Sequence, residues 1–432
     1  MNRTQARPMF LDIDLESAQG HALLDSVATR YGPWVTQAAK LTSRMFLLRS
    51  PWAPGLRFVG AEAKQRIPGE TGSTLLSVSL SGSGEDIEEA FVCCLGEGID
   101  RLAQIERPGD VVQTANLTTM TGCCSPAAAA VIEPAAAAQR IRADALLAWV
   151  SGEPWDVVRG LKAENSTLLP ADWCLHRAKD HTILAPLAPL SVGVAAGPTF
   201  EWAASRAVLE LIERDAAALW WMGGRRGKAI PLDQPGLSEI VTLVAALRQH
   251  TNDRVSWMLD ITSDIGIPVV AALSCGRDGR QLAYGLAARP SIKQAMRAAF
   301  LELCQTELGI MIAAAKCAEF GEGQLDATDR CHLQRSEIAA NDCDLFQAEG
   351  FSLENALESE LELSPILGAL QRRGIEVVFV NLSRPELAIP TVRAVAPGLQ
   401  LMPSSFVTDR LRQEIVRSGG GALHMRGMQL MQ

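Results

Sequence analysis

Several signatures of nucleic-acid binding are missing from this 432-residue chain. It contains only two tyrosines and eleven phenylalanines, too few to predict a stacking surface for single strands. Its formal net charge is −9, and its lysines and arginines form no cluster along which a phosphate backbone could lie. We therefore expect no nucleic-acid partner, although a single nucleotide would need only a local site.

Common metal-binding and hydrolase motifs are also absent. The ten cysteines include no C-x-x-C pair, and the nearest grouping with histidine, at Cys331 and His332, lacks the spacing of a zinc site. The sequence has no G-x-x-x-x-G-K-[ST] loop and no serine or cysteine nucleophile signature. These absences argue against a structural zinc, a P-loop enzyme and a serine or cysteine hydrolase.

The chain also lacks a long apolar run. No segment approaches the ~20 consecutive apolar residues of a membrane helix. The N-terminus, MNRTQARPMFLDIDLE, lacks the apolar core of a secretory signal. We therefore expect a cytoplasmic protein with reduced cysteines and no membrane association.

Alternating strand and helix patterns make up most of the sequence. Strand–turn–helix units are expected over 73–104, 191–216 and 257–309, after a helical pattern at 21–41. Residues 376–384 and 390–399 have the composition of further strands. The segment 107–138 is expected to be irregular, and the polar segment 319–349 is expected to be a surface excursion. The pattern predicts a mixed α/β (α+β) fold.

A repeated helix pattern is the most informative feature. Three predicted helices can be aligned on Glu97, Glu210 and Glu302, with an alanine seven residues before each glutamate and a small residue three before it. An oxygen-bearing side chain follows three residues after each glutamate: Asp100, Glu213 and Gln305. Residues three apart share one helix face. The small residues would allow the three helices to pack closely and direct these oxygens into one shared cavity.

The residues alone leave two interpretations of this pattern open. Carboxylate and amide oxygens without His or Cys suit Mg²⁺, which completes its coordination with water and substrate phosphates. Arg101 and Arg214, which follow the second oxygen in two of the helices, would then contact phosphate. In the other interpretation, the same arginines and glutamates form an internal salt-bridge network, because buried carboxylates must be paired or bound to metal.

The ordered set of segments resembles the YcaO family. SVGVAAGPTFEWAASRAVLELIERDAAALWW resembles the family's S-x-G-x-A-x-G block and the E-x-x-E-R helix that follows it. SGSGEDIEEAFVCCLGEGIDRL resembles its first S-x-x-x-E-x-x-E-R helix; DIGIPVVAA, an A-x(6)-E-x-x-Q helix and IPTVRAVAPGL follow in order. The resemblance implies a catalytic domain over 50–405, with an N-terminal extension (1–50) that packs on it. It also implies a C-terminal tail (406–432) that reaches the active site.

The resemblance further implies an ATP-using fold, in which strand–turn–helix units surround a nucleotide cavity and acidic residues hold Mg²⁺ against the phosphates. Carried over residue by residue, the implied metal ligands are Glu97, Asp100, Glu210 and Glu213. Gln305 would lie on the same side of the nucleotide, and Arg101 and Arg214 would contact phosphate or brace the carboxylates. Glu213, Arg214 and Gln305 would be the catalytic residues, and Glu302 and Arg297 are further candidates.

The resemblance implies an azoline-forming cyclodehydratase subunit, which uses ATP to convert Cys, Ser or Thr of a ribosomally made precursor peptide into thiazoline or oxazoline. Its implied partners are the precursor peptide, a leader-binding subunit and a flavin-dependent dehydrogenase, in a homodimer or hetero-oligomer. The alternatives are a thioamide- or amidine-forming enzyme with an external nucleophile, or a nucleotide-binding scaffold without activity.

Four departures from the family pattern keep these alternatives open. Cys93 stands where the family motif has Ser, and Asp100 stands where it has Glu. Ser83 occupies a turn position where many relatives have Lys. The chain also ends without the Pro-x-Pro-x-Pro tail of many azoline-forming members.

Overall fold

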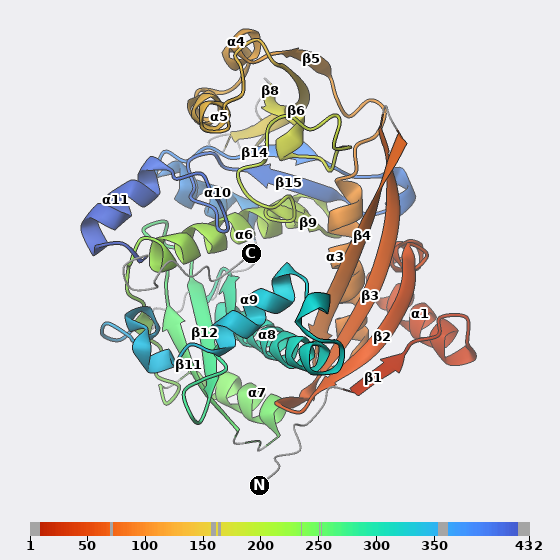
Figure 1. Ribbon diagram of the computed structural model, residues 1–432, viewed down its shortest axis with the longest axis vertical. Coiled ribbons are helices and arrows are strands. Elements are labelled where there is room, and N and C mark those ends of the chain that lie inside the picture. Colours follow the sequence, from red (N-terminus) through yellow and green to blue (C-terminus); the bar gives the residue numbers. More distant parts are fainter. Residues whose placement is uncertain are drawn as a thin grey trace.

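Three antiparallel sheets surround three long helices in the computed structural model (Figure 1). The structure describes residues 9–69, 72–156, 161–162, 166–234, 236–249, 251, 253–352 and 362–421. Every pairing between the named strands in these ranges is antiparallel. The arrangement confirms the predicted mixed α/β fold class.

The first sheet consists of a long curved hairpin with two flanking strands, in the order β1-β2-β3-β4. Helix α3 packs on its inward side against β4 and β3, and α1 and α2 pack beside α3. The strands are β1 (Met9–Asp12), β2 (Thr42–Ser50), β3 (Ala53–Gly69) and β4 (Gly72–Gly84); the helices are α1 (Ala18–Tyr31), α2 (Trp34–Ala39) and α3 (Ile87–Ala103).

The second sheet has the order β10-β11-β12-β13 and carries the longest described helix, α8, on β12 and β13. Helix α7 packs between α8 and β3, so it joins the first two sheets, and α9 packs on α8. The elements are β10 (Lys228–Ala229), β11 (Arg254–Asp260), β12 (Val269–Gly276), β13 (Ala283–Ala288), α7 (Ser238–Arg248), α8 (Ile292–Phe320) and α9 (Ala327–Ser336).

The third sheet has the order β5-β6-β14-β15-β9, with β7 and β8 also paired to β6. Helix α6 packs against β15 and β9, and nearly all its apolar side chains are buried in one core cluster. The elements are β5 (Gln113–Asn116), β6 (Leu146–Asp156), β7 (Leu161–Lys162), β8 (Thr167–Pro170), β9 (Val194–Ala196), β14 (Val378–Asn381), β15 (Thr391–Val395), α4 (Leu117–Met120), α5 (Pro126–Ala138), α6 (Phe200–Trp221), α10 (Leu363–Gln371) and α11 (Asp409–Ser418).

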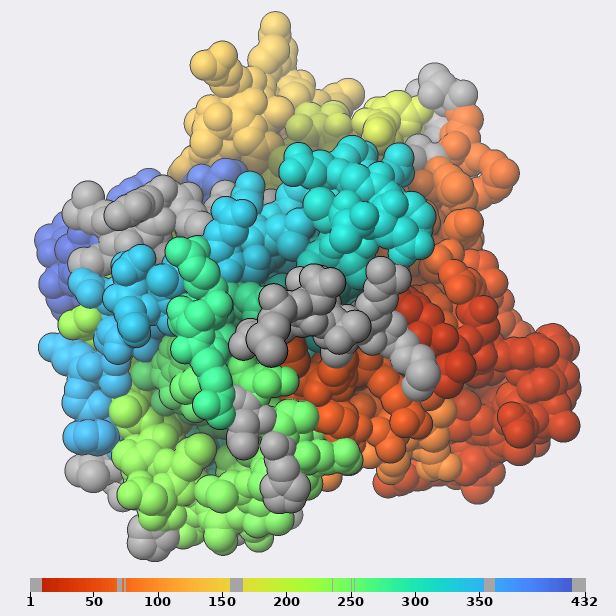
Figure 2. All heavy atoms as spheres, turned by 60° about the horizontal axis from the view of Figure 1, so that its bottom comes forward, coloured from red at the N-terminus to blue at the C-terminus, as the bar shows by residue number. Residues whose placement is uncertain are grey.

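Two expectations about irregular segments were wrong. Residues 107–138 contain β5, α4 and α5, because Asn116 and Ser125 cap the two helices through their side chains. This segment forms a lobe that projects from the body in Figures 1 and 2. Residues 319–349 are not only a surface excursion, because they include α9 and place Leu345 and Phe346 in the core.

Helix α8 is long and apolar enough to cross a membrane by length and composition, although the sequence shows no continuous apolar run. Of its most apolar stretch, 56% is buried inside the protein. Its buried residues, which include Met296, Phe300 and Leu303, belong to a core shared with α7 and the first two sheets. These contacts identify α8 as a core helix.

Candidate functional site

The same two kinds of contact recur in each of the three helices, an N-cap at the start and a glutamate further along. An N-cap side chain accepts a hydrogen bond from the first turn of each helix: Asp86 in α3, Thr199 in α6 and Ser291 in α8. One glutamate of each helix then accepts a hydrogen bond from the strand segment that precedes that helix in the chain. The distances are 2.8 Å from Ser81 N to Glu97, 3.0 Å from Gly193 N to Glu210 and 3.2 Å from Leu286 N to Glu302.

These three strand segments lie at the edges of three different sheets. β4, β9 and β13 each end a strand order, so their outward N–H groups have no neighbouring strand. The glutamates satisfy one such donor each, which an unpaired edge would leave to solvent. The repeat found in the sequence therefore has a structural basis, because each copy couples one helix to the edge strand of its own sheet.

In two of the helices, the oxygen-bearing residue that follows three positions after the aligned glutamate faces the edge strand of another sheet. Glu213 of α6 accepts a hydrogen bond from Ala288 N at the end of β13, at 3.3 Å. Asp100 of α3 faces the backbone N–H of Ala196 in β9, which opposes the rise in its pKa. The third residue, Gln305 of α8, is half-buried, and its side chain makes no hydrogen bond with any residue that the structure describes. These contacts bring α3, α6 and α8 to one shared position between the sheets.

The two arginines of the repeat brace the glutamates of their own helices. Arg101 pairs with Glu97 at 2.9 Å, and Arg214 pairs with Glu210 at 3.3 Å, each one helical turn apart. Arg214 Nε also lies 3.9 Å from Glu213. The salt-bridge interpretation from the sequence therefore describes part of the site. It does not account for the whole site, because Oδ1 of Asp100 is buried without a hydrogen-bond partner among the described residues.

The carboxylates of the three helices are close enough to influence one another. Burial, followed by the charge of Glu210, raises the pKa of Asp100 well above its usual range. Burial raises the pKa of Glu213 to about 8; the charges of Glu302 and Glu210 add to this shift, and Arg214 opposes it. Burial also raises the pKa of Glu302. Such shifts occur where buried negative charge is incompletely neutralised, and they are typical of functional sites.

Two further arginines face this acidic cluster, and the sequence reasoning missed both. Arg206 lies one turn before Glu210 on α6, so its spacing was a signal that could have identified it. Arg289 follows the last residue of β13, and nothing in its local sequence indicates that it faces α6. Burial lowers the pKa of both, to about 10 for Arg289, and the charges of Glu210 and Glu213 act on both.

Arg297, a further candidate from the sequence, lies outside this cluster of contacts. Its guanidinium pairs with Glu85 at 2.7 Å and with Glu89 at 3.2 Å. These pairs connect α8 to the turn and first helical residues that follow β4. They give Arg297 a structural role between the first and second sheets.

The residues present suit Mg²⁺ held together with a phosphate ligand. The available donors are carboxylate oxygens, and the raised pKa values and the unpartnered Asp100 oxygen indicate a need for positive charge. No three His, Cys, Asp or Glu residues of the described ranges lie close enough to hold a metal ion by themselves. This is compatible with Mg²⁺, which commonly uses one or two carboxylates and takes its other oxygens from water and phosphate.

Comparisons with solved structures show the same fold. A heterocyclase in complex with substrate and cofactor aligns with a TM-score of 0.68 and 22% identity, over 91% of this chain and 54% of that one. The YcaO protein of Methanopyrus kandleri, bound with AMPPCP and Mg²⁺, has a TM-score of 0.57 and 18% identity, over 88% and 90%. The E. coli microcin synthetase McbBCD complex with pro-MccB17 bound has a TM-score of 0.56 and 16% identity, over 83% and 88%.

Among curated proteins, an uncharacterized protein of Methanothermobacter thermautotrophicus is 27% identical over 220 residues, covering 48% of this chain and 55% of that protein. The chain thus spans about half the length of this relative and of the heterocyclase. The model of the YcaO cyclodehydratase family, described as binding ATP and Mg²⁺, matches residues 81–400. Because that match covers most of the chain, the protein belongs to the YcaO family, and ATP and Mg²⁺ are its cofactors.

Proposed function

We propose that this protein is a cyclodehydratase that uses ATP to convert Cys, Ser or Thr residues of a ribosomally made peptide into thiazoline or oxazoline. The observation that carries the proposal is the convergence of carboxylates from α3, α6 and α8 on one position, with arginines beside them. Family membership supports a reaction of this class. The heterocyclase and the microcin synthetase share the fold, which supports a peptide substrate.

We assign the metal-side role to Glu97, Asp100, Glu210 and Glu213. Their carboxylates would hold Mg²⁺ against the phosphates, and Glu302 and Gln305 would complete the polar side of the site. Arg101 and Arg214 fix the orientation of Glu97 and Glu210 through the pairs described above. The catalytic contribution of these residues is the positioning and neutralisation of charge, which is what phosphoryl transfer requires from a protein.

The proposed reaction conserves atoms and charge without a protein nucleophile. The side-chain thiol or hydroxyl of the peptide loses its proton as it attacks the preceding carbonyl carbon. The resulting oxyanion takes the terminal phosphoryl group of ATP while the bond to ADP breaks. The carbon–oxygen bond then breaks, phosphate leaves with that oxygen, and the amide nitrogen loses its proton to form the C=N bond. The peptide loses one water, and ATP becomes ADP and phosphate.

We further propose that the protein acts in the cytoplasm with other subunits. A leader-binding partner would present the precursor peptide, and a flavin-dependent dehydrogenase could oxidise the azoline to an azole. The likeness to a chain of the McbBCD complex, which has a pro-peptide bound, supports a multisubunit enzyme. A homodimer or a hetero-oligomer would both accommodate these roles.

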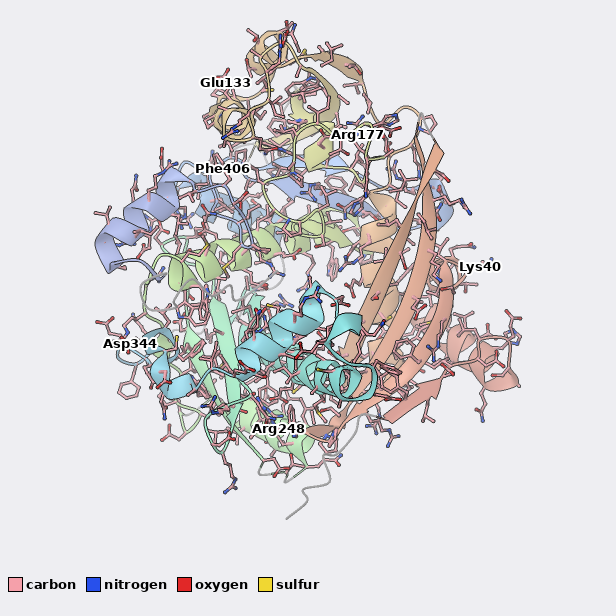
Figure 3. The ribbon with its side chains drawn as sticks, viewed as in Figure 1. Lys40, Glu133, Arg177, Arg248, Asp344 and Phe406 are labelled. Atoms are coloured by element: carbon pink, nitrogen blue, oxygen red, sulfur yellow. The ribbon has the colours of Figure 1, made fainter. Side chains whose placement is uncertain are left out.

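The direct test is a mass measurement on a peptide encoded near this gene, incubated with the protein, its candidate partner subunit, ATP and Mg²⁺. We expect loss of one water per modified residue, together with one phosphate released. Glu213→Gln should abolish both, because it removes from the proposed metal side a carboxylate that would become charged when Mg²⁺ binds. Glu133→Gln is a matched control, because Glu133 is exposed on the projecting lobe, away from α3, α6 and α8 (Figure 3).

Other outcomes of the same experiment would identify another function. Incorporation of sulfur only with added sulfide, or of nitrogen only with an added amine, would replace azoline formation with thioamide or amidine formation. Nucleotide binding without turnover, in the presence of every neighbouring gene product, would leave a scaffold. Full activity of Glu213→Gln would remove Glu213 from the site.

A further inference from the structure

Arg206 lies on α6 at the three-helix site, the position where the carboxylates of α3, α6 and α8 converge, and no described residue accepts a hydrogen bond from its guanidinium. Its side chain makes no hydrogen bond or ion pair with any residue that the structure describes, and burial lowers its pKa. The nearest carboxylate of its own helix, Glu210, is already engaged through both oxygens, by Arg214 and by Gly193 N. A guanidinium carries five N–H donors. Those of Arg206 therefore remain available to a ligand.

The ring of Trp202 holds this guanidinium in place. Arg206 follows Trp202 by one turn of α6. Its Cζ lies 5.7 Å from the centroid of the Trp202 ring, which is within the range of a cation–π contact. The ring itself packs on Gly197, where an added Cβ would lie 2.1 Å from a ring carbon. Trp202, Arg206 and Glu210 thus form a row along one face of α6, from its first turn to the acidic cluster.

Arg289 approaches the same position from β13. The backbone N–H of the preceding residue, Ala288, donates a hydrogen bond to Glu213, which fixes the backbone of Arg289 beside α6. Among the described residues, its guanidinium donates one hydrogen bond, from Nη1 to Ala288 O at 2.7 Å. The charge of Arg206 is the second cause, after burial, of the lowered pKa of Arg289. Both arginines are placed beside the carboxylates of α6, Arg206 one turn before Glu210 and Arg289 next to the residue that bonds to Glu213, and an anion bound there would be attracted by both charges.

We propose that Arg206 and Arg289 bind the terminal phosphate of the nucleotide, and that Trp202 is a positioning residue for Arg206. The inference rests on nucleotide binding at the three-helix site and adds an orientation. The end of the triphosphate that reacts would lie toward the first half of α6, with the carboxylates further along the same helix. Arginine suits this task because its planar fork bonds two phosphate oxygens at once.

The test compares two nucleotides that differ in that phosphate. Affinities of the full-length protein for AMPPCP and for ADP, each with Mg²⁺, are measured by calorimetry. Arg206→Gln and Arg289→Gln should each weaken AMPPCP binding by about tenfold or more, and ADP binding by less than about threefold. Inorganic phosphate should bind to the wild-type protein that already holds Mg²⁺ and ADP, and should not bind to either variant. This measurement distinguishes binding of a free phosphate ion from binding of the terminal phosphate of a nucleotide.

The role of Trp202 is tested by the same comparison of the affinities for AMPPCP and ADP. Trp202→Ala should weaken AMPPCP binding by about threefold, as expected for a lost cation–π contact, and leave ADP binding unchanged. Trp202→Phe should restore part of the loss. Equal loss for both nucleotides would mean that Trp202 serves only the packing of α6.

Controls keep the outcomes distinct. Arg142→Gln removes an exposed arginine that pairs with Asp144 between α5 and β6, and should change neither affinity. If Arg206→Gln does not fold, Arg206→Lys keeps the charge without the fork and should give an intermediate loss for AMPPCP alone. Unchanged or equally reduced affinities for both nucleotides overturn the proposal and leave the proposed function standing. If the arginine variants weaken AMPPCP binding more than ADP binding but the wild-type protein modifies no peptide, the phosphate assignment stands and the proposed function fails.

Discussion

At the scale of single residues, Glu213 is the clearest case of a side chain whose environment opposes its charge. It is buried on a helix whose apolar residues are mostly in the core, and its oxygens face Arg214 and a backbone N–H. Burial nevertheless raises its pKa to about 8. A charge placed at such a cost, beside Asp100 and Glu302 with raised pKa values of their own, is typical of a site that binds a cation.

The raised pKa of Glu213 predicts how pH affects the metal-free protein. Between about pH 4.5, the ordinary value, and about pH 8, the folded protein holds a proton on Glu213 that the unfolded chain has released. The contribution of this group to stability is therefore complete at low pH and is lost as pH rises through that window. Inside the window, the free energy of unfolding should fall by at most about 1.4 kcal/mol for each rise of one in pH. Urea unfolding at several pH values should show this decline in the wild type and a smaller one in Glu213→Gln. Parallel curves would contradict the assignment.

At the scale of elements, two helices are packed against glycines of their edge strands. A Cβ on Gly82 of β4 would lie 2.3 Å from Ala90 O and Cys94 N of α3, and one on Gly285 of β13 would lie 2.2 Å from Ala299 O and Leu303 N of α8. Only a residue without a side chain permits this approach. The approach places Glu97 and Glu302 within reach of the strand N–H groups that they accept from.

Gly82→Ala should therefore destabilise the protein by about 2–3 kcal/mol, because α3 must move away from β4. Gly96→Ala is the matched control, because Gly96 lies on α3, the helix that packs against Gly82. A Cβ at that position meets nothing within 4 Å, so the change should stabilise by about 0.5–1 kcal/mol through helix propensity. Urea unfolding measures both. Equal effects of the two substitutions would show that the contact of α3 with β4 does not limit stability.

At the scale of the whole molecule, the site lies where three sheets meet. Each of α3, α6 and α8 packs on a different sheet, and the carboxylates of the three helices converge on one position. Figure 1 shows the three helices between the sheets, from the N-terminal sheet around to the C-terminal strands. A ligand bound at this point contacts all three parts of the protein and should strengthen their association.

We therefore expect Mg²⁺ and ATP together to stabilise the entire fold. A ligand present at one hundred times its dissociation constant adds about 2.7 kcal/mol. Thermal unfolding should occur at the highest temperature with Mg²⁺ and ATP together, and EDTA should abolish most of the gain. A gain from ATP that is unaffected by EDTA would mean that the carboxylates do not act through a metal ion.

The sequence by itself determined the helices α3, α6 and α8, the repeat within them and the family, because these depend on local periodicity and on residue types at fixed spacing. It did not reveal α4 and α5, whose side-chain caps lie within an alanine- and threonine-rich stretch without periodicity. Only the tertiary structure brought Arg289 into the electrostatic environment of Arg206, since Arg206 lies on α6 and Arg289 follows β13, which is distant in the chain. Tertiary packing also decided the pKa of Glu213, because burial and the charges of other helices cannot be read from its neighbours in sequence.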